Sequence, residues 1–285
     1  MNTTDASHVG DRLEFLSQTA NTAVLIVGLL VLAGWIFDIP ALQAVVPGLA
    51  TMKPNTAVAF FLSGMALWLF QDEQIRRWKR RMALGCALSV ALIGFLTLME
   101  YLWRWDSGID QLLFRDVSRD ADAAAPGRMS FTTALSFYMV GLALMLVKAG
   151  NGRNRLFVQF LILATFAVSL LALVGYAYGV ESLYRVAPYG SMALHTVVTF
   201  LVLCLGILCA CPRCWLTATL FRSDAGGVRA WLWMVTSIGI PFLIGWLGLA
   251  GLRAGFYDSV FGVALVTVGT MVALAVTLLW SNSSR

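Results

Sequence analysis

The chain has 285 residues, of which 59% are hydrophobic and 12% are charged. Soluble domains of ordinary composition carry about 25% charged residues, so this composition excludes a soluble domain and predicts an integral membrane protein. The formal net charge of +5 follows from the placement of Lys and Arg at one side of the predicted membrane domain. We therefore expect no nucleic-acid partner.

Residues 1–19 are polar, include acids and lack a cleavage-type pattern. They predict a short cytoplasmic lead and not a signal peptide. Residues 20–285 are expected to form a single membrane domain.

A membrane-crossing helix needs about 20 apolar residues, and eight stretches of the chain reach or approach that length. They are Ala20–Phe37, Thr56–Phe70, Met82–Trp103, Phe131–Val147, Leu156–Tyr178, Leu194–Ala210, Ala230–Leu252 and Val260–Trp280. The second, fourth and sixth stretches are short, so these helices are expected to begin about a turn earlier.

A motif is written three times in this chain. The segments that begin at Met52, Met129 and Met192 each carry a Thr four residues on, a Phe eight residues on and then a small residue. A proline precedes each segment within a few residues, and upstream of it an apolar stretch ends in an aromatic residue followed by an acid. These pairs are Trp35 with Asp38, Tyr101 with Asp106 and Tyr176 with Glu181.

A repeat that contains two membrane-length stretches indicates copying of a helical hairpin. Gly245 and Trp246 mirror Gly34 and Trp35 and suggest a fourth, degraded copy. The predicted fold is an all-α membrane protein: an eight-transmembrane-helix bundle of about four parallel tandem hairpins, at residues 20–71, 82–148, 156–211 and 229–281. Parallel copies would pack side by side around a shared centre.

The distribution of basic residues predicts the orientation of the bundle in the membrane. Short connections on one side of the predicted bundle hold most of the 20 Lys and Arg, and the positive-inside rule is reliable for such connections. These residues are Arg12, Arg76, Arg77, Lys79, Arg80, Arg81, Lys148, Arg153, Arg155, Arg213, Arg222, Arg229 and Arg285. Both termini are therefore predicted to be cytoplasmic, and the three motifs are predicted to lie in the outer half of the membrane.

The residue just before each motif Thr is polar: Asn55, Thr132 and His195. One interpretation is structural, with these side chains capping the first turn of a helix and the Thr, Phe and small residue packing as one stripe. The other is functional, because three different polar groups at equivalent places would converge on the interior. His195 is the only histidine within a predicted span, and histidine changes charge near neutral pH.

Glu100 lies in the third span, where other units have glycine. Acids inside a membrane are costly and suggest a role, although Glu100 could also lie near enough to the surface to reach water. The functional hypothesis is a ligand pocket in the outer half of the bundle. Its members are Asn55, Glu100, Thr132 and His195, walled by Trp35, Tyr101, Tyr176 and Trp246.

Three of the five cysteines, Cys209, Cys211 and Cys214, are close enough in sequence to bind a soft metal or form a redox pair. A four-ligand metal site needs more groups, so we expect filler cysteines and no metal. Phosphate-binding loops, nucleophile elbows and HExxH motifs are missing from the sequence. We expect no enzyme and no cofactor.

Two strings, GIDQLLF and PGRMSFTTALSFYMVGLALML, are followed by LYRVAPYGSMALHTVVTFLVLCLGIL, and the stretch from SDAGG to LLW completes the pattern. Together they resemble the multi-pass N-terminal membrane regions that precede PAS, histidine-kinase or diguanylate-cyclase modules in bacterial sensor proteins. The resemblance covers about Ala20–Trp280. It implies a sensory region in the bacterial inner membrane that signals through its last helix to a cytoplasmic signalling domain. Here the sequence stops at Arg285, so the output either was removed or belongs to another membrane subunit.

The sequence is compatible with three functions. The first is a sensory module that binds a hydrophobic or small-molecule ligand in the lipid bilayer, with a homodimer among the assemblies that the sequence allows. The second is a small-solute transporter or channel, which repeated hairpins and a helix broken at Pro241 would suit. The third is a structural or assembly subunit of a membrane complex.

Overall fold

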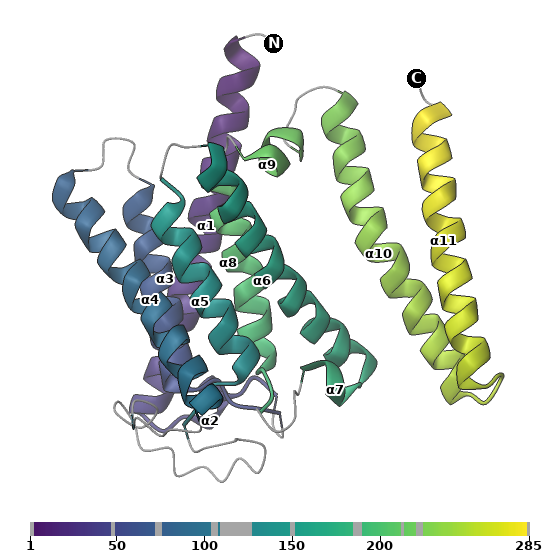
Figure 1. Ribbon diagram of the computed structural model, residues 1–285, viewed down its shortest axis with the longest axis horizontal. Coiled ribbons are helices and arrows are strands. Elements are labelled where there is room, and N and C mark those ends of the chain that lie inside the picture. The colour runs from purple at the N-terminus through teal and green to yellow at the C-terminus, as the bar shows by residue number, and fades with distance from the viewer. Residues whose placement is uncertain are drawn as a thin grey trace. The chain divides into compact units, whose positions relative to one another are not determined.

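A computed structural model describes residues 3–46, 49–71, 76–103, 108, 127–148, 152–184, 190–211, 214–220 and 225–283. All the regular elements in these ranges are helices, labelled α1 to α11 in Figure 1. The three prolines that precede the motifs, Pro47, Pro126 and Pro188, lie outside the described residues.

By contacts within the chain, two compact units are distinguished. Ala6–Thr217 form the first, which we call the six-helix unit, and Ala218–Arg285 together with Met1–Asp5 form the second, which we call the C-terminal hairpin. The sequence predicts a single membrane domain over residues 20–285, and that grouping stays a prediction.

The six-helix unit has two kinds of long helix. Three outer helices run for 27 residues or more: α1 (Thr3–Ile36), α4 (Arg77–Trp103) and α6 (Gly152–Tyr178). Three inner helices are shorter: α3 (Pro54–Phe70), α5 (Phe131–Leu146) and α8 (Leu194–Cys209). Helix α4 packs against α3 and α5, and α6 packs against α5 and α8 (Figure 1).

Helix α1 completes the ring of outer helices by packing between α3 and α8. The hydroxyl of Ser17 donates a hydrogen bond to the backbone oxygen of Gly206 in α8, 3.0 Å away. On the other side, a Cβ built on Gly28 would lie 3.1 Å from the backbone oxygen of Ala57 in α3. The polar lead predicted before Ala20 is thus helical from Thr3. Near its C-terminal end, Ser17 contacts α8.

Each inner helix begins two residues after its motif Met, at Pro54, Phe131 and Leu194. The expectation that they begin about a turn before the predicted stretches is wrong, because α5 and α8 begin at the predicted Phe131 and Leu194, and α3 begins two residues before Thr56. All three starts do lie between the Met and the Thr of the motif, as expected. The expectation that Asn55, Thr132 and His195 cap them is wrong, because the N-cap residues are Lys53, Ser130 and Ala193. Of these three, the Ser130 side chain accepts from the backbone N–H of Thr133 at 3.3 Å.

Three phenylalanines fill the centre of the unit, one from each inner helix. Phe60, Phe137 and Phe200 are fully buried. Their ring centroids are 4.8 Å, 4.6 Å and 4.7 Å apart for the pairs 60–137, 137–200 and 60–200. Aromatic pairs at this separation attract one another beyond the gain from burial, so the three rings hold the inner helices together.

Three short helices lie between the longer ones: α2 (Pro40–Gln43), α7 (Glu181–Tyr184) and α9 (Trp215–Leu220). None of the three was predicted. The outer helices α4 and α6 also extend beyond the predicted apolar stretches at their first turns, over Arg77–Arg81 and Gly152–Arg155. Arg and Lys are good helix formers whose long stems reach water.

The C-terminal hairpin consists of α10 (Ala225–Arg253) and α11 (Ser259–Ser283), which pack against each other. Helix α10 continues through Pro241. The hydroxyl of Tyr257 in the connecting turn donates to the backbone oxygen of Gly248, 2.6 Å away, and closes the hairpin.

In the part of the chain that the structure describes, four helices are long and apolar enough to cross a membrane by length and composition: Arg12–Ile36, Arg77–Trp103, Gly152–Tyr178 and Leu232–Arg253. Pro54–Phe70, Phe131–Leu146, Leu194–Cys209 and Phe261–Ala275 are shorter apolar helices. This all-helical architecture is that of a membrane protein.

Candidate ligand site at the motif end

The three motif segments gather at one end of the six-helix unit, which we call the motif end. Met52, Met129 and Met192 are each 1% exposed. The residues just before the inner helices are extended, as the N-cap angles at Lys53, Ser130 and Ala193 show. Extended backbone cannot satisfy its own polar groups, and in apolar surroundings these groups need partners.

Aromatic side chains from the outer helices supply those partners. The indole N–H of Trp35 donates to the backbone oxygen of Met52 at 2.9 Å. The hydroxyl of Tyr101 donates to Met129 at 2.7 Å, and that of Tyr176 donates to Met192 at 2.6 Å. We call these three hydrogen bonds the aromatic clamps. Each ties the end of one outer helix to the start of the following inner helix.

The connection that follows the outer helix folds in the same way in the first and third copies. Ile39 N–H donates to Gly34 O at 2.8 Å, and Val180 N–H donates to Gly175 O at 2.9 Å. A Cβ built on Gly34 would lie 2.6 Å from Leu42, and one on Gly175 would lie 2.6 Å from Leu183. Only glycine leaves room for the chain to fold back so tightly onto the helix end.

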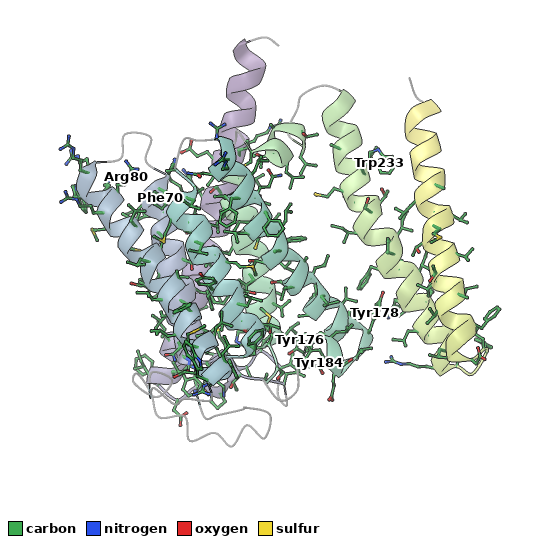
Figure 2. The ribbon with its side chains drawn as sticks, in the orientation of Figure 1. Phe70, Arg80, Tyr176, Tyr178, Tyr184 and Trp233 are labelled. Atoms are coloured by element: carbon green, nitrogen blue, oxygen red, sulfur yellow. A yellow bond between two sulfur atoms is a disulfide. The ribbon has the colours of Figure 1, made fainter. Side chains whose placement is uncertain are left out.

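In the third copy this connection is reinforced by stacking. The rings of Tyr176 and Tyr184 lie 3.9 Å apart and nearly parallel, at 10°. Figure 2 shows both side chains at the motif end, away from Arg80 and Phe70 at the opposite end of the unit. The Met192 N–H donates to Tyr184 O at 3.0 Å. Tyr184 therefore binds the third motif directly through its backbone, and its ring stacks on Tyr176, which donates to the same methionine.

Glu100 takes the place of glycine in the second copy. It is 2% exposed, and its Oε2 lies 3.3 Å from Nε of Arg128. The Arg128 guanidinium also lies over the ring of Tyr101, 5.5 Å from its centroid. A buried carboxylate is costly unless a cation pairs with it. Arg128 therefore neutralises the charge of Glu100 within the unit.

The remaining hypothesised residues lie at the starts of the inner helices. Asn55 is 5% exposed, while Thr132 is partly buried and lies 3.2 Å from the hydroxyl of Ser130. His195 is partly buried, and its Nε2 is buried without a hydrogen-bond partner among the described residues. Lys53 is also buried, at 7% exposure. Several polar side chains thus lie at or near the starts of the inner helices.

The structure brings some of the predicted pocket residues together. Glu100 and Tyr101 share the contact with Arg128, and Trp35, Tyr101 and Tyr176 act as clamps, each with its polar atom on a backbone oxygen. Trp246 belongs to the C-terminal hairpin, where its side chain is 49% exposed. A pocket shared by all eight residues stays a prediction.

The sequence analysis did not predict two features of the six-helix unit. Arg128 directly precedes Met129 in the one copy that has an acid in place of glycine, and that coincidence could have suggested the ion pair. The second feature is a cavity of about 280 Å³ at the opposite end of the unit, lined by residues of three helices. No spacing in the sequence indicates it.

The cysteine cluster begins at Cys209, the last residue of α8, and continues beyond the helix. Cys211 and Cys214 are joined by a disulfide, and Cys209 is a free, buried thiol. Among the side chains that the structure describes, no three His, Cys, Asp or Glu are grouped as metal ligands would be.

Comparison of the chain with protein-family models, with curated proteins and with solved structures gave no match. The resemblance to bacterial sensor regions therefore stays a prediction.

Proposed function

We propose that this chain is a membrane-integral sensory module that binds a ligand at the motif end. The ligand shifts the packing of the last helix, α11, and thereby signals to a cytoplasmic output domain or to another membrane subunit. No chemical step is assigned to the chain. A ligand moves such an equilibrium only if it binds one arrangement better than the other.

The proposed membrane arrangement has eight crossing helices in four parallel hairpins, with both termini on the cytoplasmic side of a bacterial inner membrane. Three findings support the parallel copies: the aromatic clamps, the inner helices that begin at the same motif position, and the central phenylalanines. The basic first turns of α4 and α6 lie at the end away from the motifs, as the positive-inside rule requires.

The observation that carries the ligand site is the Nε2 atom of His195. It is buried and has no hydrogen-bond partner among the described residues. Buried polar atoms in proteins are nearly always paired, and leaving one unpaired costs about 1–3 kcal/mol. A ligand group that donates to or accepts from this nitrogen would remove that cost.

Transport through the centre of the six-helix unit is the weaker alternative. Phe60, Phe137 and Phe200 fill the space between the inner helices. A polar route also needs several polar groups along its length, whereas the buried charge of Glu100 is paired with Arg128. The remaining observation in favour of transport is Pro241 inside α10.

Flux measurements separate these two functions. We expect liposomes that contain only the purified protein to remain impermeable to small ions and organic solutes. Flux that depends on the protein and is lost when the protein is omitted would contradict the sensory proposal.

Ligand binding is tested by thermal stability. A small-molecule library is screened against wild type, His195→Ala and the distant control Ser89→Ala, whose hydroxyl bonds only within its own helix, to Gly85 O. We expect a ligand that raises the melting temperature of wild type and of Ser89→Ala but not of His195→Ala. An equal shift in all three would contradict a site at His195.

Signalling is read from α11. A spin label at Met271, a 65% exposed position, should change its spectrum when that ligand is added in lipid nanodiscs. An optical spectrum of the purified protein adds a further control, because a Soret band abolished by His195→Ala would show that the histidine binds haem instead.

A further inference from the structure

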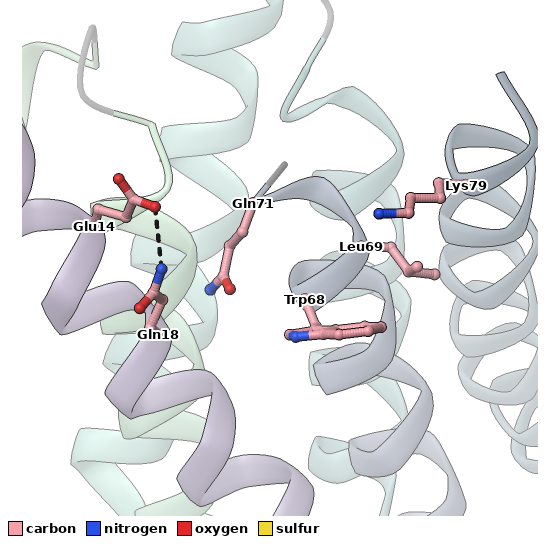
Figure 3. A pocket seen from close by; sticks show the side chains of 6 residues that line it. All are labelled: Glu14, Gln18, Trp68, Leu69, Gln71 and Lys79. Carbon is pink, nitrogen blue, oxygen red and sulfur yellow. Dashed lines mark hydrogen bonds between the residues drawn. The ribbon is translucent and has the colours of Figure 1, made fainter. Parts of the chain in front are cut away.

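The cavity of about 280 Å³ lies at the end of the six-helix unit away from the motifs, which we call the basic end. Helix α1 supplies Glu14 and Gln18, helix α3 supplies Trp68 and Leu69, Gln71 directly follows α3, and α4 supplies Lys79. Figure 3 shows these side chains around the cavity. Three helices therefore build one polar cavity.

Opposite charges stand on opposite walls of this cavity. The carboxylate of Glu14 comes from α1, and the ammonium of Lys79 comes from α4 and points toward Gln71 (Figure 3). Gln18 Nε2 donates to Glu14 Oε1 at 3.0 Å, which holds the carboxylate in place and leaves its second oxygen as an acceptor. This arrangement selects a ligand that carries both a positive and a negative group.

Gln71 adds a donor between the two charges. Its Nε2 is buried and has no hydrogen-bond partner among the described residues. A buried donor without a partner favours any ligand that brings an acceptor. Figure 3 shows the Gln71 amide directed toward Gln18 on the α1 wall, between the two charged walls of the cavity. An acceptor that enters the cavity can therefore reach this donor.

Trp68 gives the cavity an aromatic wall. Its side chain is 54% exposed, and its indole lies below Gln71 in Figure 3. The face of an indole attracts cations, and Trp is enriched at the level of lipid headgroups. Figure 3 shows the amides of Gln18 and Gln71 between Glu14 and Trp68, so the indole lines the cavity apart from the carboxylate.

The surroundings of the cavity indicate where such a ligand comes from. Phe15 and Leu16 follow Glu14 in α1 and are 67% and 43% exposed, and Trp78 and Met82 flank Lys79 in α4 and are 53% and 48% exposed. A polar cavity bordered by exposed apolar side chains suits a headgroup whose acyl chains continue along the apolar surface.

We propose that this cavity binds a phospholipid whose headgroup joins a primary ammonium to a phosphate, with the ammonium on Glu14 and the phosphate on Lys79. A purely anionic headgroup would meet the carboxylate of Glu14. A quaternary ammonium cannot donate a hydrogen bond to Glu14. The site is at the other end of the unit from His195 and does not depend on the proposed sensory function.

Native mass spectrometry of the full chain tests this proposal. The protein is exchanged into mixed micelles that contain phosphatidylethanolamine, phosphatidylcholine and phosphatidylglycerol with identical acyl chains, and the lipids that remain bound are counted. We expect phosphatidylethanolamine to be retained about tenfold over the other two, as one charge-assisted hydrogen bond predicts. Equal retention of the three, or a preference for phosphatidylglycerol, would overturn the proposal.

Variants assign the two ends of the headgroup. Glu14→Gln should abolish the preference for phosphatidylethanolamine over phosphatidylcholine, while Lys79→Gln and Gln71→Leu should lower retention of all three lipids. Lys148→Gln, an exposed lysine just after α5, is the matched control and should behave as wild type. An unchanged preference in Glu14→Gln would refute the assignment, provided that size-exclusion elution and helicity match those of wild type.

A soluble source of the same chemistry is distinguished by competition. Free phosphoethanolamine added at the concentration of the lipid should not displace the bound phospholipid, because it lacks acyl chains to hold it at the apolar rim. Complete displacement at that concentration would show that the cavity takes a soluble zwitterion and would overturn the lipid proposal.

Discussion

The hydroxyl of Tyr101 in α4 donates to the backbone oxygen of Met129, 2.7 Å away and 28 residues further along the chain. The same contact joins Tyr176 to Met192. A backbone oxygen in this buried, non-helical stretch has no helical partner to fall back on, so the phenol replaces the bond that a regular helix would have provided.

Removal of these hydroxyls should destabilise the six-helix unit. We expect Tyr101→Phe and Tyr176→Phe each to lower the free energy of unfolding by about 1–3 kcal/mol, since each leaves a buried carbonyl unpaired. Detergent-induced unfolding followed by circular dichroism measures this change. Tyr138→Phe is the control, because its ring packs on Phe95 at 5.8 Å; a loss as large in the control would show that the aromatic clamps contribute nothing specific.

The central phenylalanines should tolerate truncation poorly. Phe137→Ala removes a fully buried ring that contacts both Phe60 and Phe200, and such changes cost about 3–5 kcal/mol. The same unfolding assay should show a much smaller loss for Phe157→Ala, whose side chain is 47% exposed on α6. Similar losses at the two positions would mean that the three rings do not form the core.

The ion pair predicts an asymmetry between its two members. Arg128→Met removes the guanidinium that pairs with the buried carboxylate of Glu100 and should cost about 3–5 kcal/mol. Glu100→Gln should cost less, because Arg128 keeps its contact with the ring of Tyr101. A double-mutant cycle measures the coupling, with Arg80→Met, at the exposed start of α4, as the charge control. Additive effects in the cycle would rule out the pairing.

Repetition made the inner helices predictable. The apolar stretches Phe131–Val147 and Leu194–Ala210 differ by one residue from α5 and α8, because the motif marks their starts and the apolar run ends with the helix. Capping was predicted wrongly at Asn55, where the helix already begins at Pro54. Proline suits the first helical position, since its missing N–H would be unpaired there in any case.

Local periodicity does not predict contacts between distant segments. The partner of Glu100 depends on how the chain returns to α5, and periodicity within one helix carries no information about that path. The cavity at the basic end depends on the packing of α1, α3 and α4 together. The three helices are separated along the chain by connections whose course no local pattern specifies.

Close helix contacts give the last prediction. A Cβ on Gly141 in α5 would lie 2.5 Å from the backbone nitrogen of Ala91 in α4, and a Cβ on Gly94 would lie 2.6 Å from the backbone oxygen of Ala134. In both cases the obstacle is backbone, so α4 and α5 must separate. We expect Gly94→Ala and Gly141→Ala to destabilise the protein by about 1–3 kcal/mol through overpacking.

Gly85 in α4 is the matched control for those two substitutions. A Cβ at Gly85 meets no atom within 4 Å, so Gly85→Ala should stabilise the helix by about 0.5–1 kcal/mol, the ordinary difference between alanine and glycine in a helix. Opposite signs for Gly85 and Gly141 in one unfolding assay follow from contact between α4 and α5 at Gly141 and its absence at Gly85. Stabilisation by all three substitutions would contradict the close approach of these helices, because propensity alone would then account for every change.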